Sequence, residues 1–289
     1  MSAKLLSIQF TKMQGAGNDY IYVDATRQCP DIDLPELARA VSSPHFGVGA
    51  DGMVVILRSD NADLSMRMFN ADGSEAEMCG NASRCVALYA RERGLVDSDI
   101  MTLETRSGIK ILTIGRTDGK ITGITVDMGL PQFGADCLPG KRDDGLAVIL
   151  TAGDEAFTVI PVSMGNPHGV IFTSDLSDRV VLGKGPLLES NPRWPEKANI
   201  EFAHRTSDSD IDMRVWERGT GETLACGTGA CAVAAAAWKR GAKAKTLNIH
   251  LKGGTLNVSR DSSSGHLLLT GPAEFICDGV FYHHLPERD

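Results

Sequence analysis

Apolar and polar residues alternate in many short runs of this 289-residue chain, which is the pattern of half-buried β-strands. Met66 and Met68 alternate with polar neighbours, as do the apolar residues between Ile211 and Val215. The other runs predicted as strands are Leu6–Met13, Tyr20–Asp24, Met53–Leu57, Met101–Thr105, Ile109–Ile114, Ile121–Asp127, Phe157–Val162, Gly169–Phe172, Leu247–Leu251, Thr255–Ser259 and His266–Thr270. Strands therefore dominate both halves of the chain.

Helical patterns are few, and one of them is very rich in small residues. The predicted helices are Leu34–Val41, Asn81–Arg93 and Thr228–Arg240, with a short one near Pro186–Asn191. The helix over Thr228–Arg240 contains six alanines and only one bulky residue, Trp238, so its surroundings must approach it on every side. Because strands and helices do not alternate regularly, we expect no doubly wound parallel sheet. We predict a strand-rich α/β (α+β) fold in which curved, mostly antiparallel sheets or barrels wrap central helices.

The two long predicted helices each begin at a Cys-Gly pair, and the pairs lie 147 residues apart (226 − 79). Cys79-Gly80 and Cys226-Gly227 align without a gap into the helices that follow. A second match has nearly the same offset, because Gly17-Asn18-Asp19 precedes Gly165-Asn166-Pro167 by 148 residues (166 − 18). Two matches at nearly one offset indicate that the chain contains two copies of one unit.

This duplication sets the expected domain boundaries. We predict an N-terminal domain over residues 1–128, completed by the C-terminal segment 275–289, and a C-terminal domain over residues 129–274. The connection lies near Gly129–Gly145, a stretch rich in glycine and charge.

Composition narrows the class of protein and of partner. The chain is 42% hydrophobic and 23% charged, which is typical of a globular protein. A net charge of −8 and a pI near 5.4 argue against nucleic acid or a membrane surface as partner. The sequence shows neither a transmembrane run nor a signal peptide at Met1. We expect a cytoplasmic protein, and a homodimer stays open.

The seven cysteines are expected to be reduced thiols in such a compartment. Those outside any motif, which we expect to be small buried residues, are Cys29, Cys137 and Cys277. Cys85 and Cys231 are expected in the core. A zinc site built from Cys79, Cys85, Cys226 and Cys231 is disfavoured by their Cys-x5-Cys and Cys-x4-Cys spacings, so we expect no metal.

Each Cys-Gly pair places a thiol at a helix start, where unpaired N–H groups and a partial positive charge favour an anion. Two such helices could hold one carboxylate, with a thiol on each face of the neighbouring carbon. One thiolate would remove the α-proton and the other thiol would return a proton to the opposite face. The donors for the developing enediolate would be the backbone N–H groups of Gly80, Asn81, Gly227 and Thr228. This chemistry needs no cofactor.

Several motifs, in order and over almost the whole chain, resemble those of the diaminopimelate epimerases. They are Lys12–Tyr20, Phe69–Glu75, Met78–Asn81, Gly165–His168, Glu217–Gly219 and Ala225–Gly229. The resemblance implies a cofactor-independent inversion between LL- and meso-diaminopimelate, in lysine and peptidoglycan precursor biosynthesis. It also implies two similar domains, each a sheet around a central helix, with the site between them.

The resemblance also implies roles for individual residues. Cys79 and Cys226 would be the acid/base thiols, and Glu217 and His168 would contact the substrate amines or tune the thiols. The residues that would hold the reacting carboxylate are Gly80, Asn81, Gly227 and Thr228. Those that would position the substrate are Asn18, Asn70, Asn166, Asn199 and Arg218. Two positions depart from the family pattern: Gly52, where some members have glutamine, and Ala82, where glycine is common.

Three alternatives remain. One is another two-cysteine racemase, acting on proline, hydroxyproline or histidine. The polar set around Arg218 favours a substrate with a second amino acid head group instead, and Asn81 differs from the histidine that follows Cys-Gly in proline racemases. The others are a non-catalytic amino acid binding protein and a zinc-stabilised scaffold. Intact thiols at Cys79 and Cys226 argue against the binding protein.

Overall fold

The computed structural model describes residues 5–27, 32–133 and 146–284, and the chain divides into two compact units. The first unit comprises Met1–Val126 and Pro272–Asp289, and the second comprises Asp127–Gly271. The predicted domains, 1–128 with 275–289 and 129–274, have slightly different ends. Most of the predicted connection, residues 134–145, lies outside the described residues.

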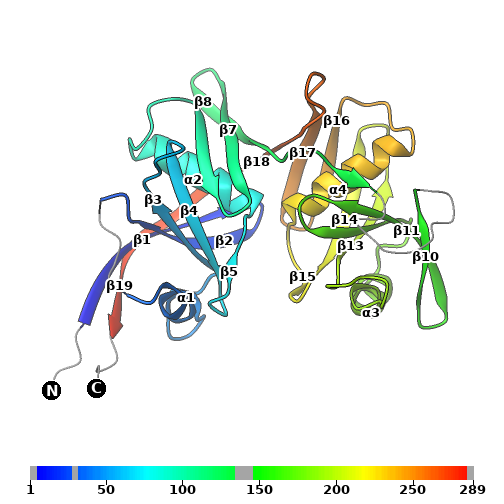
Figure 1. Ribbon diagram of the computed structural model, residues 1–289, viewed down its shortest axis with the longest axis horizontal. Coiled ribbons are helices and arrows are strands. Elements are labelled where there is room, and N and C mark those ends of the chain that lie inside the picture. The colour runs from blue at the N-terminus through cyan, green and yellow to red at the C-terminus, as the bar shows by residue number, and fades with distance from the viewer. Residues whose placement is uncertain (1–4, 28–31, 134–145, 285–289) are drawn as a thin grey trace. The chain divides into compact units, whose positions relative to one another are not determined.

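The first unit is a mixed sheet that uses both ends of the chain (Figure 1). Its strands are β1 (Leu5–Gly15), β2 (Asn18–Asp24), β3 (Gly52–Leu57), β4 (Leu64–Asn70), β5 (Glu75–Ala76), β6 (Ile100–Thr105), β7 (Gly108–Thr117), β8 (Lys120–Asp127) and β19 (Glu274–His284). Neighbours follow the order β19–β1–β2–β3–β4–β6–β7–β8, and β5 pairs with β4. The pairs β2–β3 and β4–β6 are parallel, and the others are antiparallel.

The second unit repeats this arrangement. Its strands are β9 (Gln132–Phe133), β10 (Val148–Ala152), β11 (Glu155–Ser163), β12 (Pro167–Phe172), β13 (Asn199–Arg205), β14 (Asp210–Glu217), β15 (Gly221–Glu222), β16 (Thr246–Leu251), β17 (Gly254–Arg260) and β18 (Leu267–Gly271). Neighbours follow the order β10–β11–β12–β13–β14–β16–β17–β18, with β12–β13 and β14–β16 parallel. The same succession of parallel and antiparallel pairs in both units confirms the predicted duplication.

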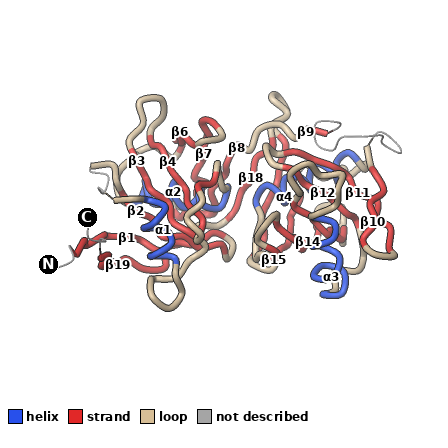
Figure 2. The backbone as a smooth tube through the Cα atoms, turned by 60° about the horizontal axis from the view of Figure 1, so that its bottom comes forward, coloured by secondary structure: helices blue, strands red, loops and turns tan. Residues whose placement is uncertain are grey.

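The helices occupy matching places in the two units, as the tube in Figure 2 shows by colour. α1 (Leu34–Ser42) and α3 (Asp178–Glu189) each connect a parallel pair of strands, and α2 (Gly80–Glu92) and α4 (Gly227–Lys239) connect the other pair. α4 packs on strands from β11 to β18, and its residues from Gly229 to Ala237 are all buried. The predicted strand-rich fold with a wrapped central helix is therefore confirmed.

The prediction of a short helix near Pro186–Asn191 is wrong, because α3 begins at Asp178 and ends at Glu189. Gly183, Gly185 and Pro186 lie within this helix, and glycine and proline are weak helix formers. A Cβ at Gly185 would lie 2.8 Å from the side chain of Trp216 on β14. Close packing of α3 on the sheet thus requires glycine at position 185. The same glycine weakens the helical pattern of the sequence.

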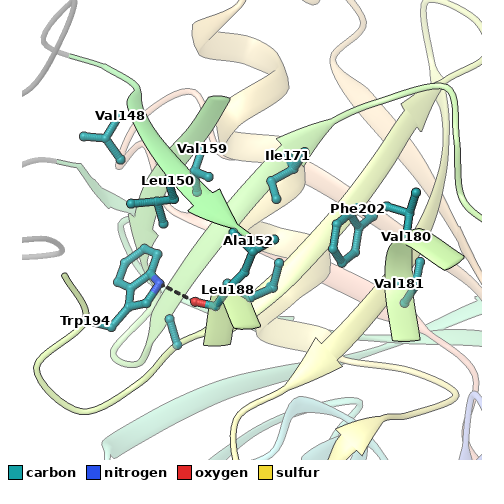
Figure 3. Close-up of a cluster of buried hydrophobic side chains, with 12 residues drawn as sticks. Val148, Leu150, Ala152, Val159, Ile171, Val180, Val181, Leu188, Trp194 and Phe202 are labelled. Carbon is teal, nitrogen blue, oxygen red and sulfur yellow. Dashed lines mark hydrogen bonds between the residues drawn. The ribbon is translucent and has the colours of Figure 1, made fainter. Parts of the chain in front are cut away.

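A hydrophobic core of the second unit lies between α3 and the strands β10 to β13 (Figure 3). Alternate residues of β10, Val148, Leu150 and Ala152, point into it as the period of a strand requires. Trp194 closes one side and donates its indole N–H to the carbonyl of Leu188 at 3.0 Å. This core supports β12 and β13, the strands that carry His168 and Asn199.

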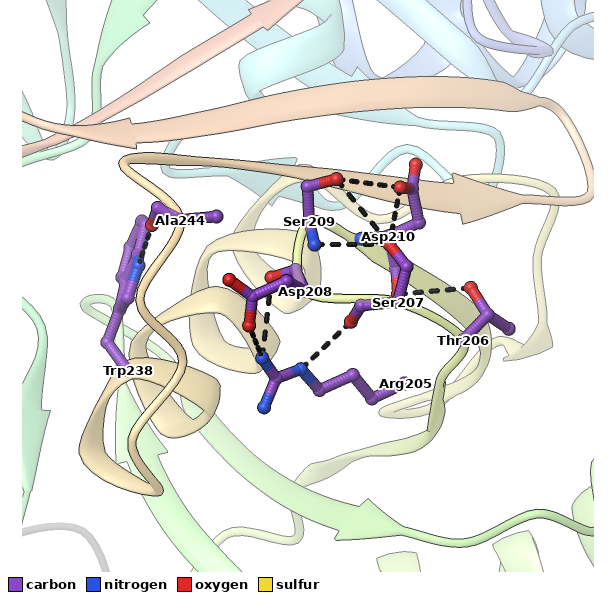
Figure 4. Close-up of polar contacts among 8 residues, drawn as sticks. All are labelled: Arg205, Thr206, Ser207, Asp208, Ser209, Asp210, Trp238 and Ala244. Carbon is purple, nitrogen blue, oxygen red and sulfur yellow. Dashed lines mark hydrogen bonds and ion pairs between the residues drawn. The ribbon is translucent and has the colours of Figure 1, made fainter.

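Polar contacts fix the turn between β13 and β14 (Figure 4). Asp210 accepts hydrogen bonds from the hydroxyls of Ser207 and Ser209, both at 2.7 Å. At the far end of α4, the Trp238 indole donates to the carbonyl of Ala244 at 2.8 Å. These contacts hold the register of the hairpin and the end of the helix.

Among the described residues, no helix has both the length and the hydropathy needed to cross a membrane.

Candidate active site

The first thiol lies at the start of α2. Cys79 is the N-cap residue, with an extended backbone (φ −137°, ψ 124°), and its side chain is half-buried. The Sγ atom lies 3.5 Å from Oδ1 of Asn18, at the start of β2. The same oxygen accepts a hydrogen bond from Nδ2 of Asn81 at 3.3 Å. The fold thus brings Asn18, Cys79 and Asn81 together, as the sequence motifs suggest.

Two residues that sequence reasoning missed hold these amides in place. Asp51 accepts a hydrogen bond from Nδ2 of Asn18 at 2.6 Å. Arg84 is fully buried and donates to Oδ1 of Asn81 at 2.8 Å and to the carbonyl of Pro272 at 3.1 Å. An arginine within an otherwise apolar helix face was the available signal, because long charged side chains are seldom buried without a role.

The second thiol lies at the start of α4 and is more deeply buried. Cys226 is the N-cap residue and is 6% exposed, and its Sγ accepts the N–H of Gly229 at 3.4 Å. The hydroxyl of Thr228 lies 3.5 Å from the same sulfur. A thiolate here would be stabilised by the helix start, whereas burial favours the neutral thiol.

Behind this thiol, a line of hydrogen bonds crosses from α4 to β13. Nδ2 of Asn166 donates to the hydroxyl of Thr228 at 3.4 Å, and Oδ1 of Asn166 lies 3.0 Å from Nε2 of His168. The other ring nitrogen, Nδ1, lies 2.6 Å from Oε1 of Glu201. His168 and Glu201 are both fully buried. The sequence predicted Asn166, His168 and Thr228 as site residues but missed Glu201.

Glu217 ends β14 and shares a hydrogen bond with the Cys226 thiol, while the hydroxyl of Thr223 donates to its Oε1. Burial raises the pKa of Glu217 above its ordinary value. Burial also raises the pKa of the Cys226 thiol well above its ordinary range, and the carboxylates of Glu217 and Glu201 raise it further. At neutral pH the structure therefore favours Cys226 as a protonated thiol.

The predicted distal residues have other contacts. Asn70, the last residue of β4, donates from Nδ2 to the hydroxyl of Ser74 at 3.0 Å. Buried Asn199 donates to the carbonyl of Pro167 at 3.1 Å and accepts the N–H of Arg218 at 2.9 Å. Nη1 of Arg218 donates to the carbonyl of Glu196 at 3.3 Å. Asn199 therefore fixes the chain around Arg218.

The two departures from the family pattern fit the backbone. A Cβ at Gly52 would lie 2.1 Å from the carbonyl oxygen of Phe69 and 2.8 Å from the ring of Tyr20, so this backbone admits no larger residue. Ala82 is fully buried in the first turn of α2. Its methyl group fills space against the sheet, and alanine suits a helix better than glycine does.

The remaining cysteines separate into buried and exposed thiols. Cys85 and Cys231 are buried, as predicted, but the prediction of a buried Cys277 is wrong because it is exposed on β19. Cys29 and Cys137 lie outside the described residues. Within residues 5–27, 32–133 and 146–284, no three or more His, Cys, Asp or Glu side chains are placed to hold a metal ion.

Comparison with known proteins identifies close relatives over nearly the full chain. The family model described as diaminopimelate epimerase matches residues 10–134 and 160–276. The diaminopimelate epimerase of Desulfovibrio desulfuricans is 45% identical over 286 residues, which cover 96% of this chain and 99% of that relative. The diaminopimelate epimerase of Bacteroides thetaiotaomicron is 48% identical over 275 residues, with coverages of 94% and 97%.

Solved structures of more distant proteins share the fold. A hydroxyproline epimerase from Agrobacterium vitis, with bound trans-4-hydroxy-L-proline, has a TM-score of 0.69 at 17% identity and covers 97% of this chain and 94% of its own. A phenazine biosynthesis protein of the PhzF family from Bacillus anthracis has a TM-score of 0.68 at 19% identity, with coverages of 95% and 99%. At such identities the likeness concerns the fold alone.

Proposed function

The chain belongs to the diaminopimelate epimerase family, and we propose that Cys79 and Cys226 are the two acid/base thiols of its reaction. The enzyme is an isomerase that interconverts LL- and meso-diaminopimelate. The observation that supports the thiol assignment is that each cysteine caps the start of a buried helix, where backbone N–H groups can receive a carboxylate.

The reaction moves one proton off and one proton onto the α-carbon. Cys79, as a thiolate, takes the α-proton onto Sγ, and the electron pair left on carbon spreads into the carboxylate. The N–H groups of Gly80, Asn81, Gly227 and Thr228 stabilise the resulting enediolate. Cys226 then donates its thiol proton to the opposite face of the carbon. Burial raises the pKa of Cys226. Cys226 is therefore suited to begin as the acid when Cys79 removes the α-proton.

The remaining predicted residues hold the rest of the substrate. Asn18 and Asn166 lie beside the two helix starts, where they orient the reacting amino acid group. Asn70, Asn199 and Arg218 form the distal set, in which the planar Arg218 guanidinium suits the far carboxylate. Glu217 and His168 contact substrate ammonium groups or tune Cys226.

Other parts of the proposal concern cofactors, cellular setting and assembly. The reaction as written requires neither cofactor nor metal, since both proton transfers use side chains of this chain. We place the enzyme in the cytoplasm, where its thiols stay reduced, and a homodimer fits the proposal. A racemase acting on proline, hydroxyproline or histidine is less favoured, because the solved structures named for proline and hydroxyproline match only at the level of fold.

One experiment tests both the activity and the two thiols. The reduced full chain is incubated with LL-diaminopimelate in deuterated water, and α-deuterium incorporation and stereochemistry are followed for the wild type, Cys79→Ala and Cys226→Ala. We expect conversion by the wild type and a loss of at least about 100-fold in each variant. A wild type that neither exchanges nor inverts would refute the activity. A variant that epimerises at the normal rate would refute the thiol assignment, and parallel runs with proline and histidine test the alternative.

A further inference from the structure

Glu201 is a fully buried carboxylate for which the two-thiol reaction assigns no role. It lies on β13, its Oε1 lies 2.6 Å from Nδ1 of His168, and its Oε2 has no hydrogen-bond partner among the described residues. A buried charge is tolerated when an opposite charge compensates it. His168, fully buried and in direct contact, is placed to supply that charge.

The contact of the second ring nitrogen also favours a charged His168. Nε2 lies 3.0 Å from the amide oxygen of Asn166, which can only accept a hydrogen bond. With Glu201 ionised, both ring nitrogens therefore face acceptors, and both contacts are satisfied when His168 is an imidazolium. Nδ2 of Asn166 then faces the hydroxyl oxygen of Thr228 at 3.4 Å.

Thr228 connects Asn166 to the Cys226 thiol. Because its oxygen accepts from Asn166, its hydroxyl hydrogen is available to the Cys226 sulfur at 3.5 Å, where it suits a thiolate. If His168 were neutral at Nε2, the Asn166 amide would have to turn over. The Thr228 hydroxyl would then donate to Asn166 and leave its oxygen as an acceptor for the Cys226 S–H.

The packing at Gly229 shows that Glu201 and Cys226 both lie against the first turn of α4. A Cβ at Gly229 would lie 2.8 Å from Oε1 of Glu201 and 3.2 Å from Sγ of Cys226. The absence of a side chain in the first turn of α4 lets the Glu201 carboxylate approach the positive end of the helix. The groups that charge this region are Glu201 on β13, His168 on β12 and Glu217 on β14.

We propose that Glu201 is a positioning residue that holds His168 as an oriented imidazolium, and that Glu201, His168, Asn166 and Thr228 couple the charge of His168 to the protonation of Cys226. The coupling rests on the proposed function, in which Cys226 alternates between thiol and thiolate during turnover. With His168 charged, the Thr228 hydroxyl supports the thiolate that remains after Cys226 has given its proton to the α-carbon. This hydrogen bond acts against the direct effect of the Glu201 carboxylate, which disfavours the thiolate.

The test begins with the charge of His168 in the full chain. Nitrogen-15 NMR of labelled histidine reports ring protonation, and a His168→Asn variant assigns the resonance. We expect both ring nitrogens of His168 protonated at neutral pH in the wild type, and a neutral ring in Glu201→Gln. The kcat of Glu201→Gln should fall about 10- to 100-fold with KM nearly unchanged, and Glu201→Asp should recover part of it.

A matched control comes from another histidine–carboxylate pair of the same unit. Nε2 of His250 lies 3.0 Å from Oδ1 of Asp210, and this pair does not touch the line of hydrogen bonds. Asp210→Asn should change the His250 resonance and leave kcat and the His168 resonance as in the wild type. If Glu201→Gln behaves like Asp210→Asn, or if His168 is neutral in the wild type, the positioning role is wrong.

A double-mutant cycle isolates the coupling through Thr228. The pH midpoint of Cys226 alkylation, read on its peptide by mass spectrometry, is measured for the wild type, Glu201→Gln, Thr228→Val and the double variant. Loss of the Glu201 charge acts directly on Cys226 in both backgrounds, so non-additivity reports the hydrogen-bonded line. We expect non-additivity of about threefold or more in the thiolate fraction, and additive effects would overturn the coupling.

Folding and function are separated by the design. If circular dichroism shows that Glu201→Gln is unfolded, Glu201→Asp takes its place in the double-mutant cycle. The NMR and alkylation measurements need no turnover. A wild type without epimerase activity therefore refutes the proposed function, while these two readouts still decide the positioning role of Glu201.

Discussion

Cys79 and Cys226 begin equivalent helices, but the side chains behind them differ in charge. Each unit contains a corresponding parallel pair of strands, β2–β3 in the first and β12–β13 in the second. His168 and Glu201 lie on β12 and β13, and the equal register places Tyr20 and Val54 at the corresponding positions of β2 and β3. A histidine–glutamate pair thus occupies positions in the second unit that hold a phenol and an aliphatic side chain in the first.

The first turns of the two helices differ in a matching way. Gly229 and Ala82 each lie three residues after their cysteine, and a Cβ at Gly229 would lie 2.8 Å from the Glu201 carboxylate. Five residues after the cysteine, the first unit has the buried Arg84 and the second has Cys231. Duplication thus repeats the backbone that presents a thiol, whereas the side chains around each thiol are free to set a different charge.

Gly229→Ala should give the largest effect. Its Cβ would meet Oε1 of Glu201 at 2.8 Å, so either Glu201 or the helix start must move. We expect kcat to fall by about 100-fold or more, because catalysis depends strongly on the placement of the acid. The matched change Ala82→Gly should cost about 1 kcal/mol of stability and little activity. Equal activity losses in steady-state assays would show that the two helix starts are equivalent after all.

Arg84→Met tests the buried cation of the first unit. Asn81 and the carbonyl of Pro272 would lose their donor, and we expect the free energy of unfolding to fall by about 3 kcal/mol. Cys231→Ala at the corresponding position of the second unit should cost only about 1 kcal/mol. Urea unfolding measures both. Similar costs would contradict a special role for charge at this position.

Glu217→Gln tests the carboxylate that corresponds to the uncharged Asn70. Burial raises the pKa of Glu217, so its contribution to stability is complete at acid pH and is lost as the pH rises through that pKa. The variant should therefore have a higher urea midpoint than the wild type at pH about 8 and not at pH about 4, while activity falls about tenfold.

Glu222→Gln is the control of opposite sign for this prediction. Burial alone would raise the pKa of Glu222, but hydrogen bonds from Arg214 and Lys252 outweigh it and lower the pKa. Its ionised form therefore stabilises the fold at pH values above the ordinary pKa of a glutamate. The variant should lower the urea midpoint at pH about 8. A lower midpoint for Glu217→Gln as well would contradict the sign assigned to burial.

Thiol labelling gives the smallest and most local effect. Burial raises the pKa of Cys85 to about 11, whereas Cys277 is exposed. Iodoacetamide at pH about 8 should label Cys277 in the folded protein and leave Cys85 unlabelled. Peptide mass spectrometry measures both sites, with the urea-unfolded chain as control. Labelling of Cys85 at a rate equal to Cys277 would show that the first unit opens around α2.

Sequence patterns found most of this fold because strands and helix starts leave local signals. The alanine run of α4 predicts a helix enclosed on every side, and its residues are buried. No strand was predicted over β13, and Glu201 within it was not among the predicted site residues. Its partner His168 is 33 residues away, so no local window reveals why the carboxylate is buried.

Each Cys-Gly helix start is a short-range signal in which thiol, glycine and helix lie within a few residues of one another. The sequence by itself therefore determined the two thiols, the duplication and the family resemblance. The packing of β12, β13 and β14 against the first turn of α4 decided how deeply Cys226 is buried and which carboxylates surround it. Burial first, and then these carboxylates, raise its pKa. Ionisation depends on burial and on nearby charge, and both are set by residues far apart in the chain.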